Sequence, residues 1–176
     1  MYKKSDRFLM AAELFVLYSF VGWIYEEVLE VFIYGTGFTN RGFLFGPYLP
    51  VYGTGALLLL FLLYPMKQKR KFSYGTPLAV FLGSMVIATV VELITSYGLS
   101  YFGISLWNYD HYFLNFQGRI ALNPSVRFGL GGVFFLYVLQ PGFEGIIKKQ
   151  SPKILRILGI TVIIILSADL IIKLVM

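Results

Sequence analysis

The sequence predicts an all-α integral membrane protein with about five transmembrane helices. Hydrophobic residues make up 57% of its 176 residues, and the mean hydropathy is +0.73. Charged residues make up only 14%, against about 25% in a typical soluble domain. Because lipid offers no hydrogen-bond partners, the backbone of each apolar stretch is expected to form a helix. This length fits one membrane domain over residues 1–176, located in the cell membrane.

Five apolar stretches are long enough to cross a bilayer. A hydrocarbon core about 30 Å thick needs about 20 apolar residues in helical form. The stretches are Phe8–Tyr34, Pro50–Met66, Pro77–Phe102, Val126–Ile147 and Ile154–Val175. The first does not look like a cleaved signal peptide, because it carries Glu13, Glu26, Glu27 and Glu30.

Basic residues predict the orientation of these helices. Eleven of them fall on one side of the membrane, namely Lys3, Lys4, Arg7, Lys67, Lys69, Arg70, Lys71, Lys148, Lys149, Lys153 and Arg156. Four fall on the other side, namely Arg41, Arg119, Arg127 and Lys173. The positive-inside rule then places the N-terminus in the cytoplasm. This bias accounts for the net charge of +6 without a nucleic-acid partner and predicts contact with anionic membrane lipids.

The two external segments, about 35–49 and 103–125, resemble each other. Arg41 precedes Pro47 by six residues, and Arg119 precedes Pro124 by five. The motif YGTG follows the first proline, and the similar motif FGLG follows the second. We therefore predict an internal repeat of two parallel helix–loop–helix units and a further helix, at 8–66, 76–147 and 154–176. Membrane transporters are often built from such repeats.

Two acidic residues lie deep in predicted spans, where charges are costly and usually functional or paired. Glu26 follows Arg7 by about 27 Å along the helix, at about 1.5 Å per residue, which places it in the outer part of the first span. Glu92 lies at a similar depth in the third. Its helix face is small and polar, with Ala88, Thr89, Thr95 and Ser96. These carboxylates either pair with Arg41 or Arg119 and tie the loops to the bundle, or form the wall of a binding site.

Three external arginines complete a predicted mixed-charge pocket. The planar guanidinium of arginine binds carboxylate or phosphate through paired donors. Snorkelling at the start of the fourth span is an alternative role for Arg127. The predicted substrate-binding residues are Glu26, Arg41, Glu92, Arg119, Trp23, Asn40, Trp107 and Arg127.

The aromatic run Trp107–Tyr112 has two interpretations, an interfacial belt or a lid over a ligand. His111, the single histidine, gives little support to a metal or haem site. Near the helix ends, spacing of four residues predicts the pairs Asp169–Lys173 and Glu144–Lys148. Glu13 is close enough to the inner face to reach the interface.

The sequence lacks the motifs of several kinds of catalytic and binding site. The absence of cysteine excludes disulfides, thiolate metal sites and a cysteine nucleophile. The sequence contains no phosphate-binding loop of the type GxxxxGK[ST], no HExxH and no GxSxG. We therefore predict no cofactor and no metal, and favour a protein that is not an enzyme. Energy-driven transport would need a separate ATPase subunit.

Two motif blocks resemble a known family. The first comprises Gly22, Trp23 and Glu26 followed by NRGFLFGPxxPxYG at Asn40–Gly53. The second comprises Glu92 with Thr95 and Ser96, WNYD at Trp107–Asp110, and NFxGRI at Asn115–Ile120. Together they resemble the family named Putative ABC-transporter type IV (CmpB-like), over about residues 15–135. The family's second block more usually reads WDYS, and this departure leaves the roles of Asp110 and His111 undefined. The resemblance implies a permease.

The sequence thus favours a multi-pass membrane transport protein, either a permease or a substrate-binding subunit with a polar Glu/Arg site near the external face. Its ligand would be a small molecule or a lipid head group. One alternative is a protein that handles lipid head groups or polyprenyl phosphate, as a flippase or a membrane enzyme. Another is a non-catalytic membrane sensor.

Overall fold

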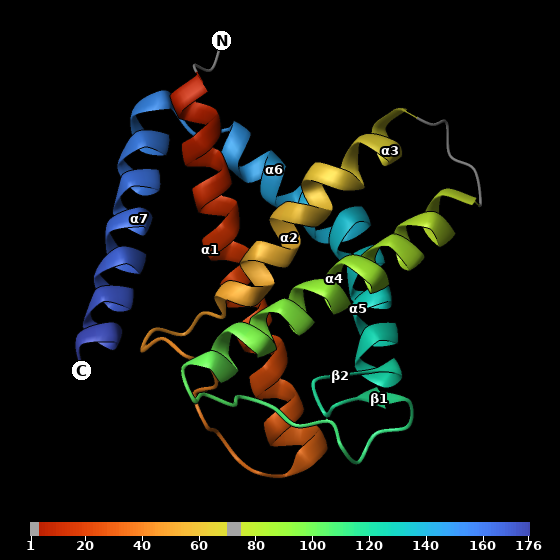
Figure 1. Cartoon of the computed structure of the whole chain (residues 1–176). Helices are drawn as coiled ribbons and strands as arrows, with labels where there is room; N and C mark the ends of the chain where they lie inside the picture. The colour runs from red at the N-terminus through yellow and green to blue at the C-terminus, as the bar shows by residue number, and fades with distance from the viewer. Residues whose placement is uncertain (1–3, 70–74) are drawn as a thin grey trace. The chain divides into compact units, whose positions relative to one another are not determined.

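The computed structural model describes residues 4–69 and 75–176, and most of these residues are helical (Figure 1). A two-stranded antiparallel hairpin pairs Asn115 with Ala121 and Phe116 with Ile120. The elements in order are α1 (Lys4–Val28), η1 (Leu29–Tyr34), α2 (Pro50–Leu62), α3 (Tyr64–Lys69), α4 (Gly75–Tyr101), β1 (Asn115–Phe116), β2 (Ile120–Ala121), α5 (Leu122–Phe134), η2 (Phe135–Leu139), α6 (Gln140–Lys148) and α7 (Pro152–Val175). The predicted all-α membrane class is confirmed.

Within the described residues, four helical segments are long and apolar enough to cross a membrane, namely Ser5–Tyr34, Gly75–Tyr101, Leu122–Lys148 and Pro152–Val175. The predicted second span is shorter than expected, because α2 has only 13 residues. At about 1.5 Å per residue, it covers roughly two thirds of a hydrocarbon core about 30 Å thick. A turn at Leu63 separates it from α3. Pro65 has no N–H and therefore cannot continue the helical hydrogen bonds of α2.

The orientation of the helices stays a prediction. Three of the basic residues on which it rests, Lys3, Arg70 and Lys71, lie outside the described residues.

Helix ends follow local sequence signals. Gly35 ends η1 with a φ of 67°, the left-handed conformation that glycine adopts most readily. Ser151 begins α7, where its Oγ accepts a hydrogen bond from Ile154 N at 3.3 Å. Pro152 follows at the first helical position, where its missing N–H has no cost. These caps explain why the predicted first and last spans agree closely with the observed ones.

Contacts group the chain into two compact units. Unit 1 comprises residues up to Thr54 together with Phe143–Met176, and unit 2 comprises Gly55–Gly142. The boundaries pass through α2 and α6, so they differ from the boundaries of the predicted repeat.

In unit 1, α1 and α7 lie side by side (Figure 1). Gly159 allows this approach, because a Cβ there would overlap the side chain of Leu9. Leu9 forms a buried cluster with Ile147 and Leu155. Arg156 Nε donates to Asp6 Oδ1 at 3.1 Å near the N-terminal end of both helices.

The first turns of α2 also pack closely on α1. Gly22 leaves room for the ring of Tyr52, and Gly53 packs against Phe15 and Ser19. Small residues at such contacts let the helix backbones approach each other.

In unit 2, α4 packs against α5 through small and polar side chains. Gly129 lies against Phe81, and Gly132 lies against Ser84. Thr89 Oγ1 donates to Ser125 Oγ at 2.7 Å. The small, polar face predicted around Glu92 is therefore a helix contact.

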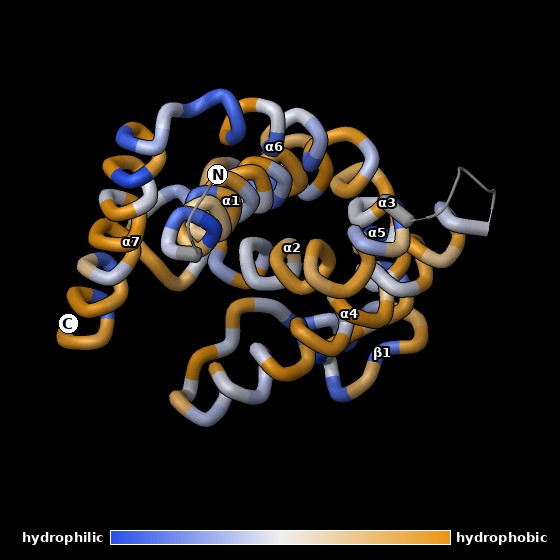
Figure 2. Tube along the Cα trace, turned by 90° about the horizontal axis from the view of Figure 1, so that it is seen from above, coloured by the Kyte–Doolittle hydropathy of each residue, from blue (hydrophilic) through white to orange (hydrophobic). Residues whose placement is uncertain are grey.

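The remaining surface is strongly apolar. Figure 2 shows hydrophobic residues along most of α7, and Ile164 and Ile171 are about three-fifths exposed, at 61% and 60%. An exposed face of this kind suits lipid rather than water.

Prediction from the fold: Gly132→Ala should lower the free energy of unfolding by about 1–3 kcal/mol, because the new methyl group would overlap Ser84. Denaturant unfolding of the detergent-solubilised protein measures the change. Gly131→Ala is the matched control, since a Cβ at that position would meet no other side chain or neighbouring segment within 4 Å. Equal effects of the two substitutions would contradict the close α4–α5 contact.

Candidate functional site

Two buried carboxylates at the end of α1 and in η1 hold the loop that follows them. Glu27 and Glu30 are 6% and 3% exposed. Glu27 Oε1 accepts from Arg41 N at 2.7 Å, and its Oε2 accepts from Thr39 N at 3.3 Å. Glu30 forms an ion pair with the guanidinium of Arg41 and accepts from the hydroxyl of Thr36. The carboxylates thus supply acceptors to a loop that has no regular structure of its own.

Trp23 and Asn40 are joined across this loop. Trp23 Nε1 donates to Asn40 Oδ1 at 3.0 Å, and Asn40 Nδ2 donates to Phe45 O at 3.3 Å. The indole also stacks on Phe20 and meets Phe38 edge-on. Asn40 has a φ of 47°, a conformation that asparagine tolerates better than most residues.

Glu26 has a different partner from those predicted by the sequence. It is half-buried and accepts a hydrogen bond from the hydroxyl of Tyr52 at the start of α2. The observed ion pair of Arg41 is with Glu30, one turn further along.

Asp169 of α7 is a site residue that the sequence analysis missed. Its oxygens accept from Phe45 N at 3.0 Å and from Gly46 N at 2.9 Å, and the hydroxyl of Tyr48 donates to it as well. The ammonium of Lys173, its predicted partner, lies 4.6 Å from the centre of the Phe45 ring. Asp169 is the one acidic residue in Pro152–Val175. An acidic residue that stands alone in an apolar span was the feature of the sequence that could have identified it as a site residue.

Tyr48 is a neutral donor in this cluster. Burial raises the pKa of its phenol above the usual range, and the hydrogen bond to the Asp169 carboxylate raises it further. The folded state therefore holds the phenol proton more tightly than the unfolded state does. The stability from this contact is present at neutral pH and is lost only as the pH rises above the range where free tyrosine ionises.

Unit 2 holds its own carboxylate and loop. Glu92 of α4 is 6% exposed, and its Oε1 accepts from the hydroxyl of Tyr109 at 2.8 Å. Trp107 Nε1 donates to the backbone oxygen of Arg119 at 2.9 Å. Tyr109 N donates to Gly118 O at 2.8 Å, which ties the aromatic segment to the β1–β2 turn. Trp107 and Tyr109 therefore act as anchors for the loop, whichever role the aromatic run has toward a ligand.

Arg119 is held by neutral groups. Its Nη1 donates to Ser96 O at 3.1 Å, to Ser96 Oγ at 2.9 Å and to Ser100 Oγ at 2.7 Å. Its guanidinium carbon lies 4.2 Å from the centre of the Tyr97 ring. Among the described residues it has no ion pair, and neither Nη2 nor Nε donates a hydrogen bond. Its charge and two of its donor nitrogens remain available, although the side chain is half-buried.

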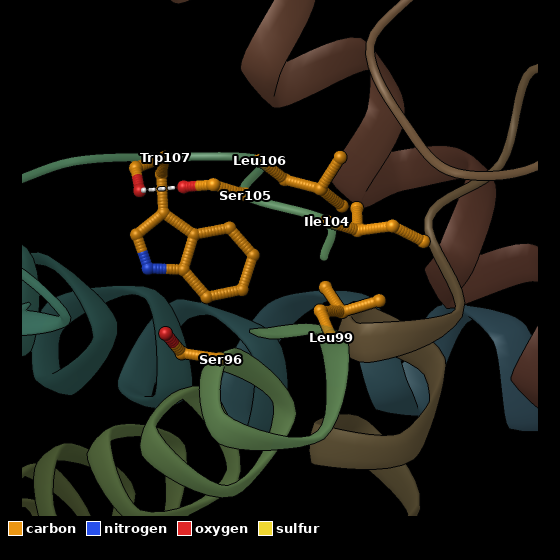
Figure 3. A pocket seen from close by; sticks show the side chains of 6 residues that line it. All are labelled: Ser96, Leu99, Ile104, Ser105, Leu106 and Trp107. Carbon is orange, nitrogen blue, oxygen red and sulfur yellow. Dashed lines mark hydrogen bonds between the residues drawn. The ribbon is translucent and has the colours of Figure 1, made fainter. Parts of the chain in front are cut away.

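A small, open hollow adjoins this arginine. Figure 3 shows Ser96 and Leu99 of α4 facing the indole of Trp107, with Ile104, Ser105 and Leu106 completing the lining. Ser105 Oγ donates to Trp107 O at 3.3 Å. The hollow shares Ser96 with Arg119, so a polar group bound there would lie close to the guanidinium.

Arg127 and His111 were also singled out by the sequence. Arg127 lies half-buried in α5. The ring of His111 packs against Tyr112, with the ring centres 4.3 Å apart. Within residues 4–69 and 75–176, no three His, Asp or Glu side chains are grouped so that they could hold a metal ion.

The predicted site residues divide between the two units. Trp23, Glu26, Asn40 and Arg41 belong to unit 1, and Glu92, Trp107, Arg119 and Arg127 belong to unit 2. Within unit 1, Trp23 is hydrogen-bonded to Asn40, next to Arg41. Within unit 2, Trp107 is hydrogen-bonded to the backbone of Arg119. The convergence of both groups on a single pocket stays a prediction.

Comparison with known families agrees with the resemblance seen in the sequence. The family model described as Putative ABC-transporter type IV matches residues 13–174. The chain belongs to this family. No curated protein and no solved structure matches it. Membership in an ABC-transporter family, together with the apolar helices, identifies a membrane protein related to transport and makes an ATPase chain an expected partner.

Prediction from the site: Asp169→Asn should lower the free energy of unfolding by roughly 1–3 kcal/mol, the range for hydrogen bonds to a charged group. An amide has one acceptor oxygen and an NH₂ group, so it cannot accept from both backbone N–H groups through separate oxygens. The measurement is unfolding in detergent followed by circular dichroism. Lys173→Met is the control, because it leaves all three hydrogen bonds in place, and an equally large loss in that variant would contradict the assignment.

Proposed function

We propose that the chain is the membrane subunit of a transport system, a permease or substrate-capturing subunit, that binds an anionic group at Arg119. The observation that carries this proposal is the half-buried guanidinium with neutral partners and unused donors. Arginine favours carboxylate and phosphate ligands because its donors match their geometry. By the predicted topology, this site faces the outside of the cell.

Unit 1 supports a structural role for the second arginine. Arg41 is neutralised by Glu30, and its backbone is held by Glu27. A substrate anion at Arg41 would have to compete with a buried carboxylate. We therefore assign substrate contact to Arg119 and loop organisation to Arg41.

The internal repeat is part of the same proposal, and one pair of contacts supports it. Gly53 of the first motif packs on Phe15, and Gly129 of the second motif packs on Phe81. Phe15 precedes Glu26 by eleven residues, and Phe81 precedes Glu92 by the same number. Glycines at equivalent positions of the two motifs thus pack against phenylalanines at equivalent positions of the two preceding helices. Such duplication is common in transport proteins.

A second candidate function is the handling of an anionic lipid. The hollow beside Arg119 includes the apolar side chains of Leu99, Ile104 and Leu106. An alkyl chain could lie against them while its phosphate meets the guanidinium.

Prediction for the proposed function: Arg119→Gln should weaken binding of decyl phosphate at least tenfold, because loss of a charged hydrogen bond costs about 1.5–3 kcal/mol and tenfold corresponds to about 1.4 kcal/mol. Isothermal titration of the protein in detergent, at low and high salt, measures this. Affinity should also fall as salt rises, since the guanidinium is partly exposed.

Arg41→Gln provides the matched control. It should destabilise the protein while leaving the affinity of the folded fraction unchanged. Wild-type affinity in Arg119→Gln would reject Arg119 as the anion site.

Native mass spectrometry on protein extracted gently from its own membrane separates the two candidate functions. A co-purifying ATPase chain is expected for the transport subunit. A lone chain that carries a lipid phosphate, and loses it in Arg119→Gln, would favour lipid handling instead.

A further inference from the structure

Unit 1 contains a buried carboxyl group that the proposed function does not use. Glu13 lies in the first half of α1 and is 6% exposed. Its predicted reach to the membrane interface stays a prediction. Its Oε2 accepts from Gln150 Nε2 at 2.9 Å. Gln150 belongs to the short connection between α6 and α7. Ionisable groups inside membrane helices usually mark ion or proton pathways.

Two oxygens of this pair have no hydrogen-bond partner among the described residues. They are Glu13 Oε1 and Gln150 Oε1, and both atoms are fully buried. Buried polar atoms are rarely left without a partner, and such exceptions need an explanation. Since both are oxygens on side chains already joined by one hydrogen bond, a shared positive group would satisfy them together.

The charged residues around the pair do not supply that group. Arg156 is bound to Asp6, and Lys148 is bound to Glu144. The side chains of Arg7, Lys149 and Lys153 are exposed. None of the described cations therefore forms an ion pair with Glu13.

We propose that Glu13 and Gln150 form a binding site for one proton. The proton adds to Glu13 Oε1, which converts the carboxylate to a carboxylic acid, and the new O–H donates to Gln150 Oε1. Together with the observed Nε2–H···Oε2 bond, this closes a ring of two hydrogen bonds between an acid and a primary amide. An alkali-metal ion would need several further oxygen ligands, as hard cations generally do, whereas a proton needs only the two oxygens of this pair.

The location of Gln150 gives this site a consequence. Proton binding holds the α6–α7 connection against α1, and release of the proton breaks one of the two bonds that join them. Proton occupancy is therefore linked to the position of the connection that begins α7.

Infrared difference spectroscopy of the protein in bilayers at neutral pH tests the proposal. Subtracting the spectrum of Glu13→Gln from that of the wild type should reveal a carboxylic-acid C=O band that shifts in D₂O. Glu144→Gln, at the same end of unit 1, is the control and should remove an ionised carboxylate band instead. An ionised carboxylate band at Glu13 would overturn the proposal.

Stability supplies a second readout. Glutamine at position 13 can donate to Gln150 Oε1 and accept from its Nε2, as a protonated acid does. Glu13→Gln should therefore unfold at the wild-type temperature, whereas Glu13→Ala should unfold at a lower one. The proposal of a bound proton is wrong if Glu13→Gln is as unstable as Glu13→Ala. It is also wrong if sodium, but not choline, raises the unfolding temperature of the wild type and of neither variant.

Discussion

The structure depends on carboxylates that project from apolar helices and find their donors in the connecting loops. An ionised side chain at membrane depth is costly unless it is paired, and an irregular loop needs partners for its backbone N–H groups. In unit 1, Glu27, Glu30 and Asp169 solve both problems at once, because they accept hydrogen bonds from the loop between η1 and α2. The first motif block, which follows η1, therefore consists largely of groups that donate hydrogen bonds to carboxylates on the helices.

The arginines of the two motif blocks have different surroundings. The first block contains an arginine whose charge is cancelled by Glu30. The second contains Arg119, which is oriented by serine oxygens and by Tyr97 without an ionic partner among the described residues. If the proposed duplication holds, it has kept one arginine for structure and left the other, as we propose, to bind an anion. Divergence of this kind fits a transport subunit with one recognition site.

The sequence predicted the helices well because hydropathy, caps and prolines act locally. Gly35, Ser151 and Pro152 mark helix ends through their own backbone preferences. It also singled out Trp23 with Asn40 and Trp107 with Arg119, and a hydrogen bond joins each pair. The convergence of the two pairs on one site stays a prediction. It could not predict that Asp169 binds Phe45 and Gly46, since residues more than 120 positions apart are brought together only by the packing of α7 on α1. Spacing of four residues indicated Lys173 as the partner, and the charge of Lys173 does act on Asp169, but the hydrogen bonds to Asp169 come from the distant loop.

Amide hydrogen exchange of the wild-type protein in lipid nanodiscs tests the central claim most directly. The loop amides bound by helical carboxylates are those of Thr39, Arg41, Phe45 and Gly46. These four should exchange slowly although they lie outside any helix, while Gly37 and Phe38, which are exposed, exchange fast. Uniformly fast exchange from residue 36 to residue 46 would contradict the claim that buried carboxylates hold this loop.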